Sequence, residues 1–449
     1  MTFTAISIFT TLSFRKLFLV RILLPKVRKM EKIVLTIFVF LSYTTLFAQG
    51  EAAVSTLLLQ QSISLYGAGQ IGAAIPTNDP AGFYLNPANL GYAAQNNHVS
   101  TFFMPEKANW LKVSNSNTTF STYGFNIGYN FQKKFHKIPI SVGFGYIHNI
   151  FDLGKQYRDN SNREEDYLGN PKDSFKSFSV GIGVNYYLMF NFGISFKSFN
   201  SQLLTNYNIF TGKPKVIEAN GTARDYGVMI IAPISQLLFN NANYYLDSKA
   251  FIKPKANFTL GYSLTNVGDE IHFIDKAQSD PIPRTARFGY TFDFGLDLFI
   301  KKTKINAINY SFTAEAEDRL VKVIPSEGFE YQSFMGDIKF GKNLIELKGD
   351  DDVTVRRGHI FKFFETLILE TGRFDGRGFS AEANNRKANG FGLSSEGILK
   401  LLSATIDNPI LSSVSHHFVV EYYSSNFWVD HPLETNLKGI NLYFKNIDF

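Results

Sequence analysis

Large apolar side chains alternate with small or polar ones in several separate stretches of this chain. From Phe178 the sequence reads F-S-V-G-I-G-V-N-Y, so that every second residue is large and apolar. The pattern recurs over 125–131, 140–146 and 288–294. Successive side chains of a strand point to opposite faces, so each stretch predicts a strand with one apolar and one small polar face. Closed membrane sheets turn apolar residues toward lipid and polar residues toward a lumen, and the repetition therefore predicts a transmembrane β-barrel.

The amino-acid composition favours the same fold. The 449 residues include 45 Phe and 22 Tyr, yet the mean hydropathy is only -0.07. Many aromatic residues without long apolar runs suit a membrane barrel better than a helix bundle. Alternating segments extend to the end of the chain, which favours one large sheet over several soluble domains. We therefore expect an all-β fold, an antiparallel barrel of about 14 strands over 98–449.

Candidate strands follow one another closely along this region. A tight break near Tyr187–Asn191 contrasts with a long charged connection at Lys155–Lys172. Long connections of outer-membrane barrels face the outside of the cell, and short turns face the periplasm. The candidate segments are 98–104, 118–133, 138–150, 174–188, 190–200, 203–211, 222–233, 256–266, 284–299, 304–317, 333–340, 355–374 (one strand or two), 389–402, 413–424 and 438–449.

A segment typical of a secretory signal peptide occupies residues 30–48. It has a charged start, an apolar run over Ile33–Leu41 and a small residue at its end. Its cleavage site is atypical because Leu46 stands where a small residue is usual. Residues 1–29 precede it and are interpreted as a start codon assigned too early or as an atypical leader. The pattern predicts export to the bacterial outer membrane.

The formal net charge of +6 comes from this leader. Residues 1–48 hold seven Lys or Arg and one acidic residue, which leaves 38 basic and 38 acidic residues in the mature chain. Such a balance gives no electrostatic basis for binding nucleic acid. The sequence has no cysteine, which excludes disulfides, thiolate metal sites and a cysteine nucleophile.

Residues 49–97 are expected to form a strap and a plug inside the barrel. Glu51–Gln61 reads as a short helix or an extended strap, and Ser64–Leu90 is rich in Gly, Ala, Pro and Asn with little periodicity. This stretch is too apolar for a linker. Irregular backbone is tolerated at membrane depth where protein or a water-filled cavity surrounds it, and the inside of a barrel meets that condition.

Residues Tyr66–Asn97 resemble the N-terminal segment of FadL-like outer-membrane barrels, including the PorV/PorQ family of Bacteroidota-type bacteria. In these proteins a Gly-rich start leads to an acidic turn and an aromatic-x-Asn-Pro-Ala-x-Leu motif. The usual start has two adjacent glycines, whereas this chain has Gln70-Ile71-Gly72. The matching plug-motif positions are Gly67, Gly69, Gly72, Asp79, Tyr84, Asn86, Pro87, Ala88 and Leu90.

Two further stretches resemble the PorV/PorQ branch. One is G-Y-S-L-T-N-V-G-D-E-I at Gly261–Ile271, followed by P-I-P-R-T-A-R-F-G-Y at Pro281–Tyr290. The other combines R-R-G-H at Arg356–His359 with E-T-G-R-F at Glu370–Phe374. The family resemblance implies a 14-stranded barrel with an N-terminal plug.

The resemblance implies two different jobs. PorV-like barrels serve type IX secretion and receive exported proteins, whereas FadL-like transporters pass long-chain fatty acids or other hydrophobic compounds. We expect type IX secretion or surface attachment, with hydrophobic transport as the alternative and a structural barrel or adhesin as a third hypothesis. A shared architecture does not decide between them. An inward strand kink beside an apolar tunnel would favour transport, and a sealed wall with large ordered outer loops would favour docking.

These hypotheses imply particular partners. Outer-membrane lipid, lipopolysaccharide and the barrel-assembly machinery are expected for any of them. Type IX secretion components and cargo, or a hydrophobic small molecule, would follow from the first two. The final segment ends on Phe449 with Ile447 and Tyr443 on the same face, and it resembles the signal that barrel-assembly machinery recognises.

Charged residues on the polar faces of two strands are candidates for lumen groups. Arg287, Asp293, Glu315 and Glu317 would either neutralise one another inside the barrel or select a substrate headgroup. Asn86-Pro87 suits a turn within the plug, because proline lacks a backbone donor and the asparagine amide can close a local turn. The alternative for this pair is a ligand or gating role.

Motifs typical of enzymes are missing from the sequence. G-x-G-x-x-G spacing at Gly67–Gly72 has no βαβ unit around it. His416 and His417 lie on a predicted strand and would point to opposite faces, which argues against joint metal binding. Asp350–Asp352 could offer oxygen ligands to calcium or to cations that bridge lipopolysaccharide, or form a solvated loop. We expect no enzymatic activity, no cofactor and no bound metal.

Overall fold

The structure is a computed structural model, and its described part begins at residue 52. The predicted leader at 1–48 lies outside that part. No helix in the described part is long and apolar enough to cross a lipid bilayer. The described residues are 52–449 without 111–117, 136–138, 160–164, 208–213, 239–242, 247–249, 274–278, 302, 325–327, 377–385 and 448–449.

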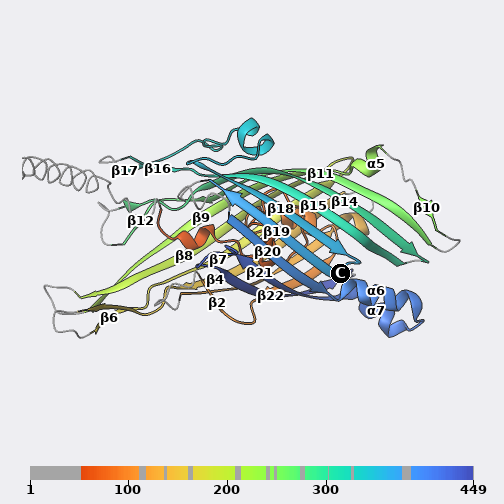
Figure 1. Cartoon of the computed structure of the whole chain (residues 1–449), viewed down its shortest axis with the longest axis horizontal. Coiled ribbons are helices and arrows are strands. Elements are labelled where there is room, and N and C mark those ends of the chain that lie inside the picture. The colour runs from red at the N-terminus through yellow and green to blue at the C-terminus, as the bar shows by residue number, and fades with distance from the viewer. Residues whose placement is uncertain are drawn as a thin grey trace, which may run out of the picture. The chain divides into compact units, whose positions relative to one another are not determined.

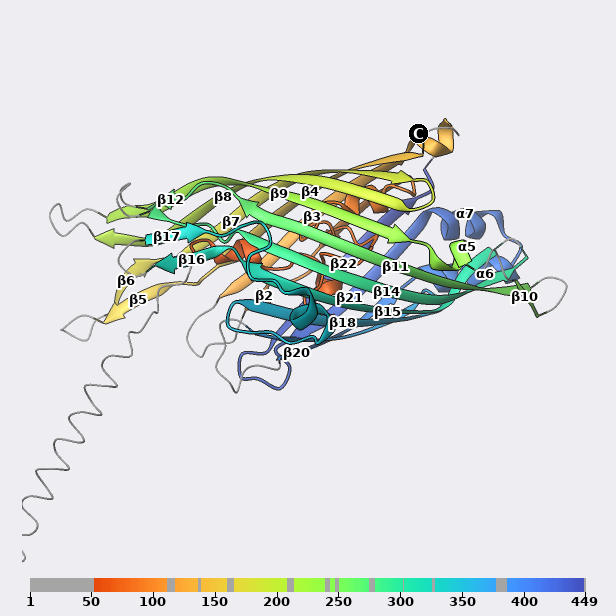
Figure 2. The same ribbon diagram turned by 90° about the horizontal axis from the view of Figure 1, so that it is seen from above.

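Fourteen antiparallel strands form the wall of a closed barrel (Figures 1 and 2). They are β1 (His98–Phe103), β3 (Thr119–Asn130), β4 (Ile140–Asp152), β7 (Lys172–Asn185), β8 (Met189–Tyr207), β9 (Pro214–Ala232), β11 (Ala250–Val267), β14 (Thr285–Ile300), β15 (Thr303–Arg319), β18 (Val353–Phe363), β19 (Leu367–Asp375), β20 (Arg386–Ser394), β21 (Phe418–Phe427) and β22 (Thr435–Lys445). The first strand closes the ring, because β1 pairs with β3 on one side and with β22 on the other. Closure satisfies the backbone groups of both edges, and it confirms the all-β barrel of 14 strands.

Side chains alternate between the two faces of this wall as the sequence pattern predicts. Phe178 is 59% exposed on the outside, and its neighbour Ser179 is 2% exposed on the inside. The same alternation places Phe144 outside and Gly143 inside. The barrel therefore presents large apolar groups outward and small or polar groups inward.

The two ends of the barrel carry different connections. Turns at 186–188 and 364–366 are short, and we call their end the short-turn end. It also carries α5 (Ile234–Leu238), β10 (Tyr244–Tyr245) and two helices, α6 (Glu396–Thr405) and α7 (Pro409–His417). The opposite end, the long-loop end, carries the longer connections. These contain β2 (Ala108–Asn109) and the hairpins β5–β6 (Gln156–Asp159, Glu165–Gly169), β12–β13 (Ile271–His272, Ser279–Asp280) and β16–β17 (Val321–Ile324, Gly328–Tyr331). The remaining helix of the wall, α4 (Phe131–Lys134), follows β3 at the short-turn end.

The strand predictions were wrong at several places. Residues 396–402 and 413–417 belong to α6 and α7, because Asn408 caps α7 by accepting from the N–H groups of Ile410 and Leu411, with Pro409 at the first helical position. The segment predicted as a strand at 333–340 is a turn that leads into the π-helix η2 (Phe340–Ile345). The two strands predicted at 190–200 and 203–211 are one long strand, β8, as far as Tyr207, and residues 208–211 lie outside the described part.

Residues 52–97, which we call the N-terminal segment, lie inside the ring of strands (Figure 2). The segment contains η1 (Ser55–Leu58), α2 (Ile63–Gly67) and α3 (Asn89–Ala93), joined by irregular backbone. The hydroxyl of Ser62 caps α2 by accepting from the N–H of Leu65. Most residues of the segment are buried, so its contacts with the inner wall decide what the barrel can do.

Candidate functional site

Five glycines stand side by side across five neighbouring strands on the inner face of the wall. The pairing register places each of them opposite the next, from β3 to β9. We call this set the glycine row. Its members are Gly128, Gly143, Gly181, Gly193 and Gly227.

The glycine row makes room for the backbone of residues 86–94. A Cβ atom added at Gly143 would lie 2.5 Å from the carbonyl oxygen of Leu90, and one added at Gly193 would overlap the carbonyl of Pro87. Contacts this short involve main-chain atoms, which cannot move aside as a flexible side chain can. The row therefore lets the N-terminal segment lie directly against the wall.

Asn86 fixes the turn that faces this row. Its side-chain Oδ1 accepts from the N–H of Ala88 at 3.0 Å, and its Nδ2 donates to the carbonyl of Ala73 at 2.5 Å. The same amide lies within 3.4 Å of the carbonyl of Tyr262 on β11. The side chain thus joins two parts of the N-terminal segment to each other and to the wall, while Ala88 packs against Met229.

A cluster of four charged side chains holds a second part of the segment. The charged cluster consists of Arg287 on β14, Glu315 and Glu317 on β15, and Arg356 on β18, all at most 8% exposed. Glu317 Oε2 forms ion pairs with both arginines, at 2.9 Å to Nε of Arg356. The carboxylates of Glu317 and Glu315 together balance the two guanidinium charges, and the ion pairs of Glu317 satisfy hydrogen bonds that water would otherwise make.

The charged cluster also bonds the backbone of residues 69–74. Glu315 accepts from the N–H groups of Gly72, Ala73 and Ala74 at 2.8–3.0 Å. Arg287 donates to the carbonyl of Gln70 at 3.0 Å.

The turn that these bonds hold depends on a left-handed backbone. Gly69 has φ 85° and Gln70 has φ 60°, a conformation that glycine adopts at no steric cost. Gly72 packs closely against Leu85, and Gly67 against the carboxyl group of Glu370. All three motif glycines therefore lie where other atoms leave no room for a side chain.

Asp293 lies apart from the other predicted lumen charges. It pairs with Lys255 at 3.0 Å and accepts from Asn309 and Ser311 at 2.7 Å. These residues lie toward the short-turn end of β14 and β15. The four charges proposed from the sequence therefore form two groups, and each carboxylate in them has a cationic or hydrogen-bonding partner.

A third anchoring group was missed in the sequence analysis. Lys197 on β8 pairs with Asp225 on β9 at 2.9 Å and donates to Oδ1 of Asn266 at 2.9 Å. Its ammonium group lies 4.2 Å from the ring centre of Tyr84, whose hydroxyl donates to the carbonyl of Leu57. Lys197 and Asp225 both occupy inward positions in the alternation of their strands. A charged residue at an inward position is the sequence signal that could have identified them.

Asp79 and the last strand meet inside the barrel. Asp79 accepts from the hydroxyl of Ser64 at 2.8 Å, from the N–H of Ala81 at 2.8 Å and from the amide of Asn441 at 3.1 Å. Tyr443 points inward, where its hydroxyl donates to Glu421 at 2.7 Å.

The predicted assembly signal is only partly described. Ile447 follows the end of β22, and its N–H lies 3.4 Å from the carbonyl of Asn97. Phe449 lies outside the described residues. Of the three residues, Tyr443 therefore contributes an inward hydroxyl and not an aromatic group on the outer face.

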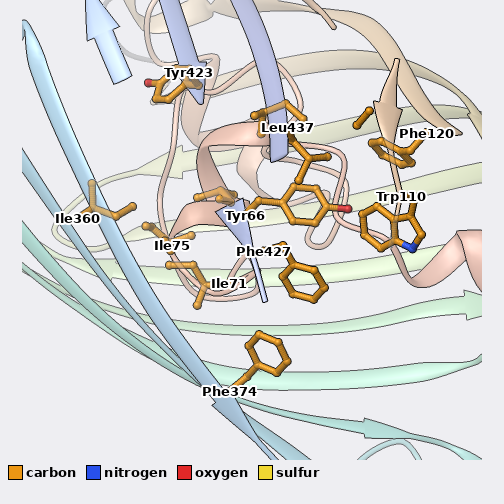
Figure 3. Close-up of a cluster of buried hydrophobic side chains, with 14 of the residues drawn as sticks. Tyr66, Ile71, Ile75, Trp110, Phe120, Ile360, Phe374, Tyr423, Phe427 and Leu437 are labelled. Atoms are coloured by element: carbon orange, nitrogen blue, oxygen red, sulfur yellow. The ribbon is translucent and has the colours of Figure 1, made fainter. Parts of the chain in front are cut away.

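Aromatic side chains gather around Tyr66 near the long-loop end (Figure 3). The rings of Trp110, Phe120 and Phe427 lie 6.0–6.4 Å from the Tyr66 ring in edge-on arrangements. Phe374 stacks on Phe427 at 5.3 Å. The N-terminal segment supplies Tyr66, and three strands and one loop supply the rest. The aromatic cluster, meaning these five residues, joins the segment to the long-loop end.

The buried hydroxyl of Tyr66 has no hydrogen-bond partner among the described residues. A buried unpartnered hydroxyl costs about 1–3 kcal/mol. We therefore expect Tyr66→Phe to raise the free energy of unfolding by roughly 1 kcal/mol, measured by urea unfolding in detergent. Phe120→Leu, which removes ring contacts and no polar group, is the control and should destabilise. Destabilisation by Tyr66→Phe would show that the hydroxyl has a partner.

The two histidines proposed to lie on a strand belong to α7, so that prediction was wrong. Their rings contact each other with centres 4.9 Å apart, and Nδ1 of His417 bonds the carbonyl of Lys445. Residues 416 and 417 end a helix because Asn408 and Pro409 start one. The described part of the chain contains no group of three or more His, Asp or Glu side chains arranged to hold a metal ion.

Asp350 closes a turn before β18. It pairs with Lys342 at 2.7 Å and accepts from the N–H groups of Val353 and Asp352. Burial disfavours its charged form, but the hydrogen bond from Lys342 and those from the backbone outweigh burial and lower the pKa of Asp350.

A lowered pKa makes this turn sensitive to acid. The stabilisation is fully present above the pKa of the unfolded chain, about 3.9, and is lost as the pH falls through the lower folded value. We expect pepsin to cut more readily within residues 340–347 as the pH falls below about 3.9, relative to an unstructured reference peptide. In Asp350→Asn the cutting should already be high at pH 5 and change little. Cutting of the parent protein that is equal across this range would contradict the prediction.

No family model matches this sequence, and no curated protein matches it. Several solved structures align with this chain. One is the Pseudomonas putida toluene transporter TodX, with 12% identity and a TM-score of 0.37, and the alignment covers 86% of this chain and 98% of that one. A Pseudomonas aeruginosa FadL homologue has 7% identity and a TM-score of 0.38, with 86% and 98% covered. The CymD monoaromatic hydrocarbon channel has 11% identity and a TM-score of 0.37, with 87% and 99% covered. The barrel described above rests on its own strand pairing and not on these matches.

Proposed function

We propose that this chain is a bacterial outer-membrane channel for small hydrophobic compounds, closed by its N-terminal segment. The observation that carries the proposal is the aromatic cluster around Tyr66. It places apolar rings in the lumen at the long-loop end, where a porin for ions or sugars would need polar or charged side chains. The short turns face the periplasm and the long loops face outward, as in other outer-membrane barrels.

The inner wall supports a plugged channel more than an open pore. The N-terminal segment occupies the lumen and is held by the charged cluster, by Lys197 and by the glycine row. Apolar compounds would first meet the aromatic cluster and would pass only when the segment shifts. The charged groups are engaged with the segment and with one another, which favours a structural task for them over recognition of a substrate headgroup.

Uptake by intact cells tests this function. Deleting the gene should lower uptake of toluene and of long-chain fatty acids, because a lipopolysaccharide leaflet resists apolar compounds. Cells treated with EDTA, which disrupts that leaflet, should take up both compounds equally with or without the gene. Equal uptake by untreated deleted and parent cells would overturn the proposal.

A second candidate is a docking barrel for type IX secretion or surface attachment, as in the PorV/PorQ resemblance. The hairpins β5–β6, β12–β13 and β16–β17 favour it, because they extend the long-loop end with ordered structure. Comparing surface and medium proteomes of the same deleted cells separates the two. Loss of exported proteins with normal uptake would select the docking role, and a change in neither would leave a structural barrel or adhesin.

A further inference from the structure

The helices α6 and α7 form a hairpin at the short-turn end, between β20 and β21 (Figure 1). The hairpin, residues 396–417, starts from a fixed point: the N–H of Ser395 donates to the carbonyl of Val420 at 2.9 Å. A turn that joins two adjacent antiparallel strands needs only a few residues. The additional residues therefore form an element of their own.

One side of the hairpin is tied to the rim of the barrel. Lys400 pairs with Glu365 at 2.6 Å and with Glu396 at 2.9 Å, and Lys445 pairs with Glu396 at 2.8 Å. Lys301, after β14, donates to the carbonyl of Ala404 at 3.0 Å. The contacts reach three separate parts of the rim, so the rotation of α6 about its axis is fixed.

Both helices of the hairpin expose apolar side chains at every fourth position. Ile398 and Leu402 lie on α6, Ile406 is its C-cap, and Ile410 and Val414 lie on α7, each between 38% and 75% exposed. Between residues 397 and 417 the only acidic or basic residues other than histidine are Lys400 and Asp407, and Lys400 faces the rim. An apolar face opposite a charged one is typical of a helix that lies in a membrane interface.

The wall beside the hairpin has an unusually short outward apolar band. On β19 the outward residues after Leu367 and Leu369 are Thr371 and Arg373. On β20 they are Leu393 and Phe391, followed by Asn389 and Lys387. A strand that crosses a bilayer needs about 9–11 residues at a tilt of about 45°.

Other strands of the wall show what a longer band looks like. On β14 the outward residues are apolar at nearly every position from Phe288 to Ile300. On β19 and β20 the outward apolar residues lie only at the short-turn end of each strand, next to the hairpin. The exposed apolar face of the hairpin therefore continues a band that the wall leaves incomplete.

We propose that the hairpin lies in the phospholipid leaflet at the short-turn end, where its exposed apolar side chains complete the lipid-facing band of β19 and β20. The inference rests on the proposed outer-membrane location. The occupant of the face is phospholipid acyl chains. The five side chains include no aromatic residue or arginine, the groups that anchor protein interfaces. Their continuity with outward wall residues such as Leu393 and Phe418 supports a shared lipid contact.

Spin labels on single cysteines test the location, because the natural chain has no cysteine. The full mature chain carries Leu402→Cys in the hairpin, Phe178→Cys on the outer wall or Ser412→Cys on α7. It is reconstituted in vesicles of phosphatidylethanolamine and phosphatidylglycerol, and collision of the nitroxide with oxygen or with a water-soluble nickel chelate is measured. We expect labels at 178 and 402 to collide mainly with oxygen, and the label at 412 with nickel.

Each other outcome has a defined meaning. Label 402 in water with label 178 in lipid overturns the hairpin proposal and leaves the barrel in its membrane. Labels 178 and 402 both in water overturn the membrane location itself. Label 402 protected from both probes, with disulfide-linked dimers on oxidation of the unlabelled Leu402→Cys protein, assigns the face to a second copy and also overturns the proposal.

Discussion

Replacing Glu317 by glutamine is expected to lower the free energy of unfolding by about 3–5 kcal/mol. Glu317 is the carboxylate shared by Arg287 and Arg356, and all three side chains are at most 9% exposed. Glutamine keeps the volume and removes the charge, which leaves Glu315 as the one remaining carboxylate of the charged cluster beside two buried guanidinium groups. Urea unfolding in detergent measures the change, with the mobility difference between folded and unfolded barrel on a gel as the readout.

The control for this variant is an exposed ion pair. Glu346 pairs with Lys348 at 3.0 Å where both side chains are more than half exposed, and Glu346→Gln should change stability little. Charge content falls by one in both variants, so the comparison isolates burial. If Glu317→Gln is no more destabilising than Glu346→Gln, the charged cluster does not hold the segment and the wall together.

Valine in place of Gly193 is expected to displace the N-terminal segment and make the barrel conduct ions. The added Cβ would overlap the main chain of Pro87, and main-chain atoms cannot move aside as a flexible side chain can. Valine favours strands, so β8 itself should still form and the N-terminal segment should be displaced instead. In planar bilayers the variant should show steady ion conductance that the parent protein lacks.

A second valine on the same strand is the matched control. Ser198 lies on the outer face of β8, and Ser198→Val adds a similar side chain away from the lumen. Like the parent protein, it should show no steady ion conductance. Equal conductance of the Gly193→Val and Ser198→Val proteins would mean that the segment tolerates the added side chain, and that the glycine row is not required for closure.

Much of the wall could be predicted from the sequence because a strand has a fixed period. Ser179 and Gly181 alternate with large apolar residues such as Phe178, and this alternation alone shows which face of the strand is apolar. Glu315 and Glu317 were assigned to the lumen by the same rule. The number of strands followed from counting such stretches, and the closure of β1 on β22 agrees with it.

The contacts of the candidate site could not be predicted in this way. Which residues of the wall meet depends on the register between neighbouring strands, which the alternation of side chains does not fix. The pairing of Arg356 with Glu317 and that of Lys197 with Asp225 are set by this register. The helices α6 and α7 were missed for a different reason, because short apolar stretches fit either a strand or a helix, and the signal that distinguishes them here is the cap at Asn408.

The pairing of β1 with β22 has a consequence for the order in which this protein can assemble. The first strand of the wall, β1, can pair with the last strand, β22, only after the whole chain has been made. A contact between such distant parts of a chain forms slowly. Until then the N-terminal segment has one open side, and its buried apolar residues remain accessible to water and to other chains. A chain truncated before β22 would therefore lose more than one strand of pairing, because it would leave both a free sheet edge and an uncovered apolar segment that promote aggregation.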